Sequence, residues 1–196
     1  YRVFDARLSY YKAGSVIHML RQMVGDDTLF FRAMINYLQQ YRWGNASTEQ
    51  FKTSIEASTG KDLDTFFSQW IYGEGFPMIT AKWDKQDTTV LVQLTQETSM
   101  PSSVALFYTP VDIRFYSQWG DYTERFYMDK PQKTFRYKTY RPIDSIKIDP
   151  EGWLLFAEPQ SPQRVYGLSA DVTPRVYPNP AHDVLHIDLQ SADEAL

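Results

Sequence analysis

The sequence contains no cysteine among its 196 residues, which excludes disulfides and thiolate metal sites. It also lacks any apolar run approaching the roughly 20 residues that a membrane-spanning helix needs, so we expect no transmembrane segment. A basic stripe that could neutralise phosphates is missing as well, and the net charge is -4. We therefore expect no nucleic-acid partner.

What is present is the composition of an ordinary globular protein, with 43% hydrophobic and 22% charged residues. A chain of 196 residues has room for one or two small domains, each with its own core. It opens on Tyr1, which is not a natural start. We therefore interpret the sequence as a piece of a longer protein.

The first part of the chain, residues 1–76, shows helical periodicity. Apolar residues in the first predicted helix recur at three- and four-residue spacing, and Gly25 ends it. A later helix begins at Ser47 with a capping box, because Gln50 stands three residues on. A last helix is predicted over 62–72. These short helices, joined by tight caps, predict a helical subdomain.

The hydrophobic period changes at Pro77 from helical to alternating, which is typical of strands. About seven short strands over roughly eighty residues favour a small antiparallel sandwich of immunoglobulin-like type. The predicted fold class is therefore α+β, with the helices first. The candidate strands are 79–83, 90–94, 106–109 with 111–116, 122–128, 134–137, 145–148 and 153–156.

The composition changes again at Glu158, where a polar stretch contains several prolines. This composition predicts a linker. Beyond it, one short alternating strand is predicted near the C-terminus. The predicted organisation is a helical part at 1–76, a β-sandwich domain at 77–157, a linker at 158–173 and a C-terminal segment at 174–196.

The most informative stretch is the start of the first helix, Tyr10-Tyr11-Lys12-Ala13-Gly14. It resembles the Tyr-x-Lys-Gly motif of the aminopeptidase N-type zinc metallopeptidases, the gluzincins. Further similar segments follow in family order, so that the resemblance covers about residues 8–156. It implies that residues 1–76 are the end of a thermolysin-like catalytic domain. The further segments are 24–27, 46–51, 66–71 with Gly75-Phe76-Pro77, and 149–155.

In this family the motif supplies a catalytic tyrosine. Matched residue by residue, Tyr10 takes the catalytic position and Lys12 that of the lysine, while Ala13 stands where the family has glycine. This departure leaves Tyr11 as the fallback. A phenol at a helix N-terminus can donate a hydrogen bond to a developing oxyanion. The zinc ligands of the family lie upstream, so the resemblance implies zinc in the full-length parent and none in this chain.

Two histidines near the C-terminus, His182 and His186, have the spacing of the H-E-x-x-H zinc motif. The residues around them alternate as in a strand, where positions i and i+4 lie roughly 13 Å apart. Two Zn–N bonds of about 2 Å cannot bridge that distance. His18 has neither histidine nor carboxylate four residues away, and we interpret it as a packing residue. No metal ligand is therefore predicted.

The C-terminal segment carries a second resemblance. Val176-Tyr177-Pro178-Asn179-Pro180-Ala181, followed by an alternating strand, is similar to the opening of a type IX (Por) secretion sorting domain. This implies a protein secreted by, or held on the outer-membrane surface of, a Gram-negative bacterium, with the type IX machinery as a partner. We expect a truncated sorting domain at 174–196. The alternative is an ordinary strand start punctuated by proline.

Together these features predict the C-terminal part of a secreted zinc aminopeptidase that removes N-terminal residues from peptides. The parent's partners would be its peptide substrates and the upstream catalytic domain of the same protein. The isolated chain is expected to be inactive, because its sequence has no zinc-binding motif. The alternative is a non-catalytic binding or scaffold module of a degenerate family member.

Overall fold

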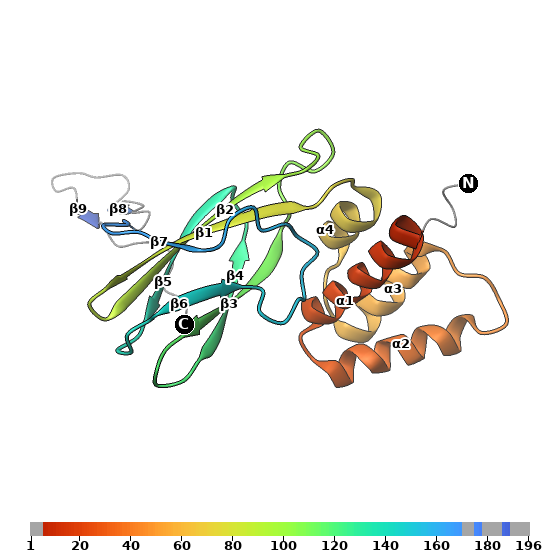
Figure 1. Cartoon of the computed structure of the whole chain (residues 1–196). Coiled ribbons are helices and arrows are strands. Elements are labelled where there is room, and N and C mark those ends of the chain that lie inside the picture. Colours follow the sequence, from red (N-terminus) through yellow and green to blue (C-terminus); the bar gives the residue numbers. More distant parts are fainter. Residues whose placement is uncertain (1–5, 170–174, 178–185, 189–196) are drawn as a thin grey trace. The chain divides into compact units, whose positions relative to one another are not determined.

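The computed structural model of the chain describes residues 6–169, 175–177 and 186–188 (Figure 1). Its helices all come before its strands, so the predicted α+β fold class is confirmed. The helical elements are η2 (Ala6–Tyr11), α1 (Lys12–Val24), α2 (Asp27–Tyr41), α3 (Thr48–Thr59), α4 (Asp64–Phe67) and η3 (Ser68–Tyr72), of which η2 and η3 are π-helical turns.

The helix ends follow from local sequence. Gly25 adopts a left-handed conformation with φ 77°, which L-residues with a side chain rarely adopt, and thereby ends α1. Asp26 then accepts a hydrogen bond from the N–H of Leu29 and caps α2. Ser47 and Gln50 form the predicted capping box at α3. Each cap satisfies backbone groups that a helix end leaves without an intrahelical partner.

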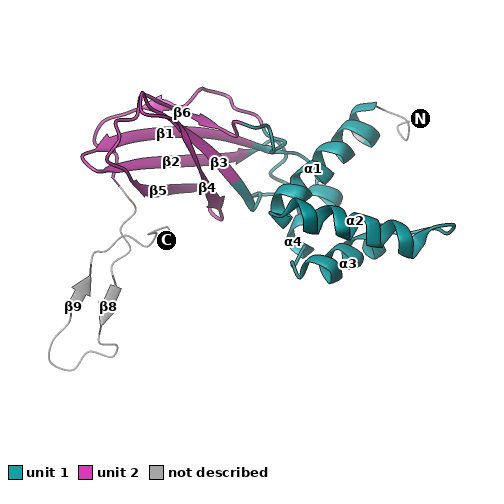
Figure 2. Cartoon of the chain, turned by 90° about the horizontal axis from the view of Figure 1, so that it is seen from below, with its two compact units in different colours: residues 1–77, 98–110, 151–156 teal, residues 78–97, 111–150, 157–196 magenta. Residues whose placement is uncertain are grey.

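The chain divides into two compact units (Figure 2). Unit 1 consists of Tyr1–Pro77, Thr98–Pro110 and Glu151–Phe156, and unit 2 of Met78–Glu97, Val111–Pro150 and Ala157–Leu196. Two segments that the sequence pattern assigns to the β-sandwich thus belong with the helices.

Those two segments are also where the strand predictions fail. Residues 153–156 form no strand, and β3 begins only at Thr109, so 106–108 form none either. Their apolar side chains are buried all the same. Phe107 packs on Trp70 with ring centroids 4.5 Å apart, and Leu154 is buried within unit 1. Apolar side chains of both segments are buried against helices. Their apolar sequence pattern therefore resembles that of a strand, although neither segment pairs with one.

Two sheets of unit 2 lie face to face. The first has the order β5-β2-β1-β7 and the second β4-β3-β6. Rings from the two sheets meet in the core, where Phe126 on β4 lies 4.7 Å from Phe135 on β5 between ring centroids. The strands are β1 (Pro77–Gln86), β2 (Thr89–Thr98), β3 (Thr109–Tyr116), β4 (Tyr122–Met128), β5 (Gln132–Lys138), β6 (Ser145–Ile148) and β7 (Gln163–Arg164).

Part of the predicted linker is held on the first sheet. Strand β7 pairs parallel with β1, with Lys82 opposite Gln163, and the N–H of Val165 donates to the carbonyl of Trp83. Farther on, β8 (Arg175–Tyr177) pairs antiparallel with β9 (His186–Asp188). His182 lies outside the described residues, as does most of the predicted sorting segment. None of the helices in the described ranges is long and apolar enough to cross a membrane.

Candidate functional site

The candidate catalytic residue Tyr10 lies in the π-helical turn η2, directly before α1. Its side chain is 60% exposed, and that of Tyr11 is 69% exposed. Single π-helical turns are rare and occur frequently at functional sites. The turn therefore presents two phenols to solvent at the N-terminal end of a helix.

The turn joins α1 without a break in helical backbone conformation. Tyr11 has φ −71° and ψ −43°, and no side chain caps the start of α1. The hydroxyl of Ser15 instead donates to the carbonyl of Tyr11 at 3.0 Å. This bond ties the end of η2 to the first turn of α1.

Lys12, the next residue along, reaches the opposite end of the helical part. Its Nζ lies 3.5 Å from the carbonyl oxygen of Gly73, just after η3. Free carbonyls at a helix C-terminus carry partial negative charge, so an ammonium group is favoured there. The motif thus places two tyrosines outward and one lysine inward.

An open groove runs along the inner face of α1. It comprises two adjoining hollows of about 210 and 290 Å³, which share Ala13, Val16 and Ile71. The smaller one is completed by Lys12 and Trp70. The larger hollow is also lined by residues of the four α-helices and of the loop before α3. These are Ile17, Tyr37, Ala46, Ser47, Thr48, Phe51 and Phe67.

A charged network lies on α3 and the residues after it. The hydroxyl of Tyr72 donates to Glu49 Oε1 at 2.7 Å, and this hydrogen bond is the main reason that the pKa of Glu49 is lowered. Lys52 pairs with Glu49 at 3.5 Å and also with Asp64. Each of these groups therefore has a structural partner.

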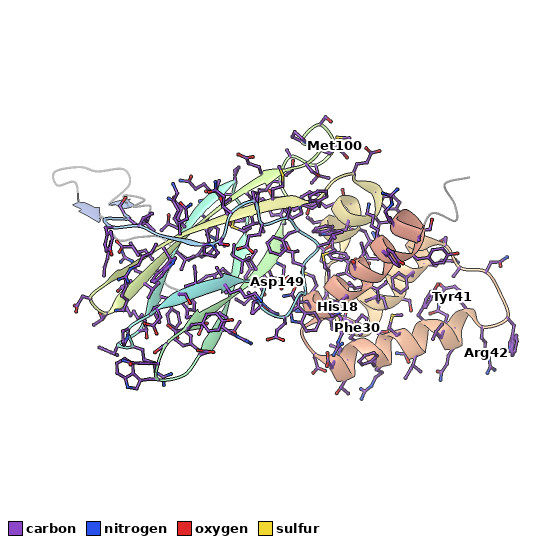
Figure 3. The ribbon with its side chains drawn as sticks, viewed as in Figure 1. His18, Phe30, Tyr41, Arg42, Met100 and Asp149 are labelled. Carbon is purple, nitrogen blue, oxygen red and sulfur yellow. The ribbon has the colours of Figure 1, made fainter. Side chains whose placement is uncertain are left out.

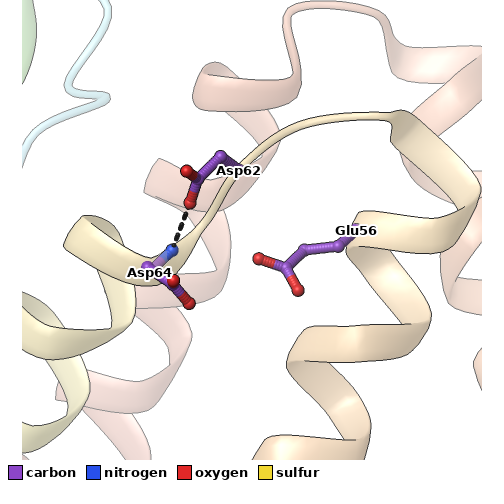
Figure 4. A group of neighbouring side chains, drawn as sticks. All are labelled: Glu56, Asp62 and Asp64. Carbon is purple, nitrogen blue, oxygen red and sulfur yellow. Dashed lines mark hydrogen bonds between the residues drawn. The ribbon is translucent and has the colours of Figure 1, made fainter.

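Three carboxylates come within 4.8 Å of one another in the described part of the chain, those of Glu56, Asp62 and Asp64 (Figure 4). Glu56 accepts the N–H of Leu63, and Asp62 accepts that of Asp64. Asp64 also pairs with the ammonium group of Lys52, so each of the three carboxylates has a structural partner. Zinc sites in proteins draw mainly on histidine and cysteine, so this set does not fit zinc.

His18 stacks on Trp153, with ring centroids 4.3 Å apart and an angle of 10° between the ring planes. Its position on α1 can be followed in Figure 3, where it is labelled. The imidazole thus packs against an indole, a partner that the sequence did not indicate. His186 lies on strand β9, and His182, the other histidine of the spacing that was rejected above as a zinc motif, is outside the described residues.

The sequence pattern missed the contact between Lys12 and Gly73, which spans 61 positions. Helical periodicity identifies the inward face of α1 but not what that face contacts. The one available signal was Lys12 itself, a charged residue on the same face as Val16.

Comparison with known proteins gives a match over the first part of the chain. Residues 1–70 match the model of the peptidase family M1 domain. Aminopeptidase 2, mitochondrial, of Saccharomyces cerevisiae is 32% identical over 83 residues, which cover 42% of this chain and 8% of that protein. Probable aminopeptidase 1 of Sulfurisphaera tokodaii is 35% identical over 78 residues, covering 40% and 10%.

Among solved structures, the chain resembles the crystal structure of Legionella pneumophila aminopeptidase A in complex with aspartic acid. The TM-score is 0.63 at 17% identity, over 85% of this chain and 18% of that one. At this identity the likeness concerns the fold. The sequence matches support the gluzincin resemblance over the first part of the chain. The matched residues span 8–10% of the length of these two curated relatives.

Proposed function

We propose that the chain is the C-terminal part of a zinc-dependent aminopeptidase and that Tyr10 is its catalytic tyrosine. The observation that carries this proposal is the exposed Tyr10 phenol in a π-helical turn, within the stretch that matches the peptidase family M1 domain. The substrates would be peptides with a free N-terminus. The zinc ligands would lie outside this chain, since the described residues hold no set that fits zinc.

The proposed role of Tyr10 is to donate a hydrogen bond to the oxyanion that forms when the scissile carbonyl is attacked. Such a donor acts mainly in the transition state, because negative charge on that oxygen develops only there. The exposed position of Tyr10 agrees with this role, since the hydroxyl remains free to meet a substrate. Tyr11, one residue on and similarly exposed, is the internal comparison.

The test is Tyr10→Phe in the full-length protein. We expect kcat to fall by about 10²–10³ with little change in KM, which is the usual effect of removing one oxyanion donor. Tyr11→Phe is the matched control and should leave both constants nearly unchanged. If the two variants exchange phenotypes, Tyr11 is the catalytic residue. If neither variant alters kcat, the catalytic assignment of both tyrosines fails. A full-length protein without measurable peptidase activity would favour the scaffold alternative.

The isolated chain provides an independent test. We expect it to hold no stoichiometric zinc and to cleave no aminoacyl reporter substrate. Metal analysis of the purified chain, after dialysis against zinc-containing buffer, measures the first expectation. One tightly held zinc ion per chain would overturn the placement of the metal site upstream.

We also propose that the protein is exported by type IX secretion and that its C-terminal segment carries the sorting signal. The support is the Tyr177-Pro178-Asn179-Pro180 run, whose first residue is the last residue of strand β8. Deleting residues 174–196 from the protein in a host with the type IX machinery should leave it in the periplasm. If the deleted protein still reaches the medium or the cell surface, this segment is not the signal.

A further inference from the structure

We propose that Lys12 is a positioning residue that fixes the direction of the Tyr10 phenol by anchoring the first turn of α1 to Gly73. This inference rests on the proposed catalytic role of Tyr10. It adds a second residue of the same site whose side chain would not touch the substrate. The observation behind it is the contact between Lys12 Nζ and the carbonyl oxygen of Gly73.

Helix geometry connects the two residues. Successive residues are turned by about 100° in an α-helix and by somewhat less in a wider π-helical turn, so positions i and i+2 lie roughly on opposite sides of the axis in either case. Lys12 points inward, where it lines the smaller hollow beside Trp70 and Ile71. Tyr10, two positions earlier, is correspondingly exposed. Any rotation of the turn that brought Tyr10 inward would pull Lys12 away from Gly73.

Arg7 and Ser9 of η2 also take part in interactions, but the side chain of Tyr10 itself is exposed. In the described part of the chain its phenol has no hydrogen bond, and a π-helical turn is a rare local conformation that needs support from its surroundings. The Ser15 hydroxyl secures the carbonyl of Tyr11, but this bond lies within the same helix. Lys12 supplies a link from this turn to a different element.

The anchor point is itself rigid. A Cβ on Gly73 would lie 2.5 Å from both the carbonyl oxygen of Gln69 and Cγ2 of Val104, so the chain passes here through a space that fits only glycine. The N–H of the next residue, Glu74, donates to the hydroxyl of Ser103 at 2.9 Å. The Gly73 carbonyl is therefore fixed from both sides.

A loop that precedes β3 completes this support. The side-chain amide of Gln69 donates to the carbonyl of Leu106 and accepts from the N–H of Tyr108, each at 2.9 Å. Residues 98–110 are thereby bound to the end of the last helix, and all of these contacts lie within unit 1. The chain of contacts that connects the loop with Tyr10 therefore passes through Gly73 and Lys12.

The experiment is a double-mutant cycle in the full-length protein with Lys12→Met and Tyr10→Phe. Methionine keeps the length and apolar stem of lysine but removes the ammonium group. We expect Lys12→Met to lower kcat about tenfold with little change in KM, because a small misplacement of a reacting group is costly. The double variant should be no slower than Tyr10→Phe alone, since Lys12 acts only through that phenol.

Two further variants separate positioning from a general loss of stability. Lys12→Arg can still reach the carbonyl and should restore most of the rate. Lys61→Met, which removes an exposed ammonium group elsewhere in unit 1, should be silent. In the 196-residue chain, Lys12→Met should speed amide hydrogen exchange in residues 6–13 and leave α3 unchanged.

The outcomes distinguish the two proposals. If Tyr10→Phe has no effect on kcat, the proposed function fails, whatever Lys12 does. If Tyr10→Phe slows the enzyme but Lys12→Met does not, or if the two effects multiply, the positioning role is refuted while the catalytic one stands. Unchanged hydrogen exchange in residues 6–13 would also refute the anchor.

Discussion

The imidazole of His18 lies parallel to the indole of Trp153, 4.3 Å away between ring centroids, although 135 positions separate them in the chain. The guanidinium of Arg21 also lies over the Trp153 ring, 5.4 Å from its centroid. A third contact joins the same segment to α1, because the N–H of Leu155 reaches the sulfur of Met19 at 3.4 Å. Residues 151–156 are therefore a structural part of the helical unit.

The first prediction concerns this contact. Trp153→Ala should lower the free energy of unfolding of the helical unit by about 2 kcal/mol, because it removes ring contact area, a stacked pair and a cation–π interaction. Urea unfolding of the chain, followed by the helical signal in circular dichroism, measures it. Trp43→Ala is the matched control, since Trp43 is 99% exposed and should contribute nothing. Equal effects of the two variants would contradict the prediction.

The helix boundaries were readable from sequence because they depend on neighbouring residues. The capping box of Ser47 and Gln50 and the stop at Gly25 involve groups at most four residues apart. The two π-helical turns were not predicted, because the sequence pattern indicated only helix at these positions. The strand prediction for residues 153–156 was wrong, because an apolar pattern indicates burial but not which element the segment is buried against.

The candidate site depends on sequence in the same way. A short motif nominates Tyr10 and Lys12, because a motif can be compared with a family from the spacing of its residues alone. The partner of Lys12 was beyond reach, because Gly73 comes near it only when the last helix folds back beside α1. Contacts between distant parts of the chain leave no local pattern.

The second prediction contrasts two glycines of the helical unit. Gly14 lies inside α1, and a Cβ added there would have nothing within 4 Å. Gly14→Ala should therefore raise the free energy of unfolding by about 0.5–1 kcal/mol, the difference in helix propensity. Gly73→Ala should lower it by about 1–3 kcal/mol, because its Cβ would overlap neighbouring atoms. Urea unfolding measures both, and a stable Gly73→Ala would show that its surroundings can yield.

The third prediction concerns Tyr137, whose ring stacks with those of Phe115 and Tyr122 in unit 2. Burial, with the nearby charge of Glu124, raises the pKa of Tyr137 from 10.0 to about 12. The folded state thus binds the phenolic proton more tightly than the unfolded state does. Between pH 10 and about 12 the unfolded state loses this proton first, so the stability of the fold should decline as pH rises.

Urea midpoints of unit 2 at several alkaline pH values test this. Tyr137→Phe keeps the ring and removes the titrating hydroxyl, so its midpoint should fall less steeply than that of the unchanged chain. Tyr140→Phe is the control, because Tyr140 is 90% exposed. A decline that is equally steep in both variants would assign the alkaline sensitivity to other groups.

The fourth prediction concerns Asp84, a buried carboxylate of β1 that is only 3% exposed. Its Oδ2 accepts the N–H groups of Gly167 and Leu168 at 2.9 and 3.1 Å and the side-chain amide of Gln86 at 2.8 Å. Hydrogen bonds to a charged acceptor are among the stronger ones, and losing one partner leaves the other groups unsatisfied. Asp84 thus fastens residues 163–168 along β1.

Asp84→Ala should release this segment and expose the bond after Arg164 to trypsin. A loss of about 2 kcal/mol of local stability would raise the open population, and with it the cleavage rate, by more than tenfold. Mass spectrometry of timed digests measures cleavage at this bond. Glu97→Ala, which removes an exposed carboxylate from β2, is the control and should be cut at the original rate. If Asp84→Ala is cut no faster than the control, the pairing of β7 with β1 holds the segment without help from Asp84.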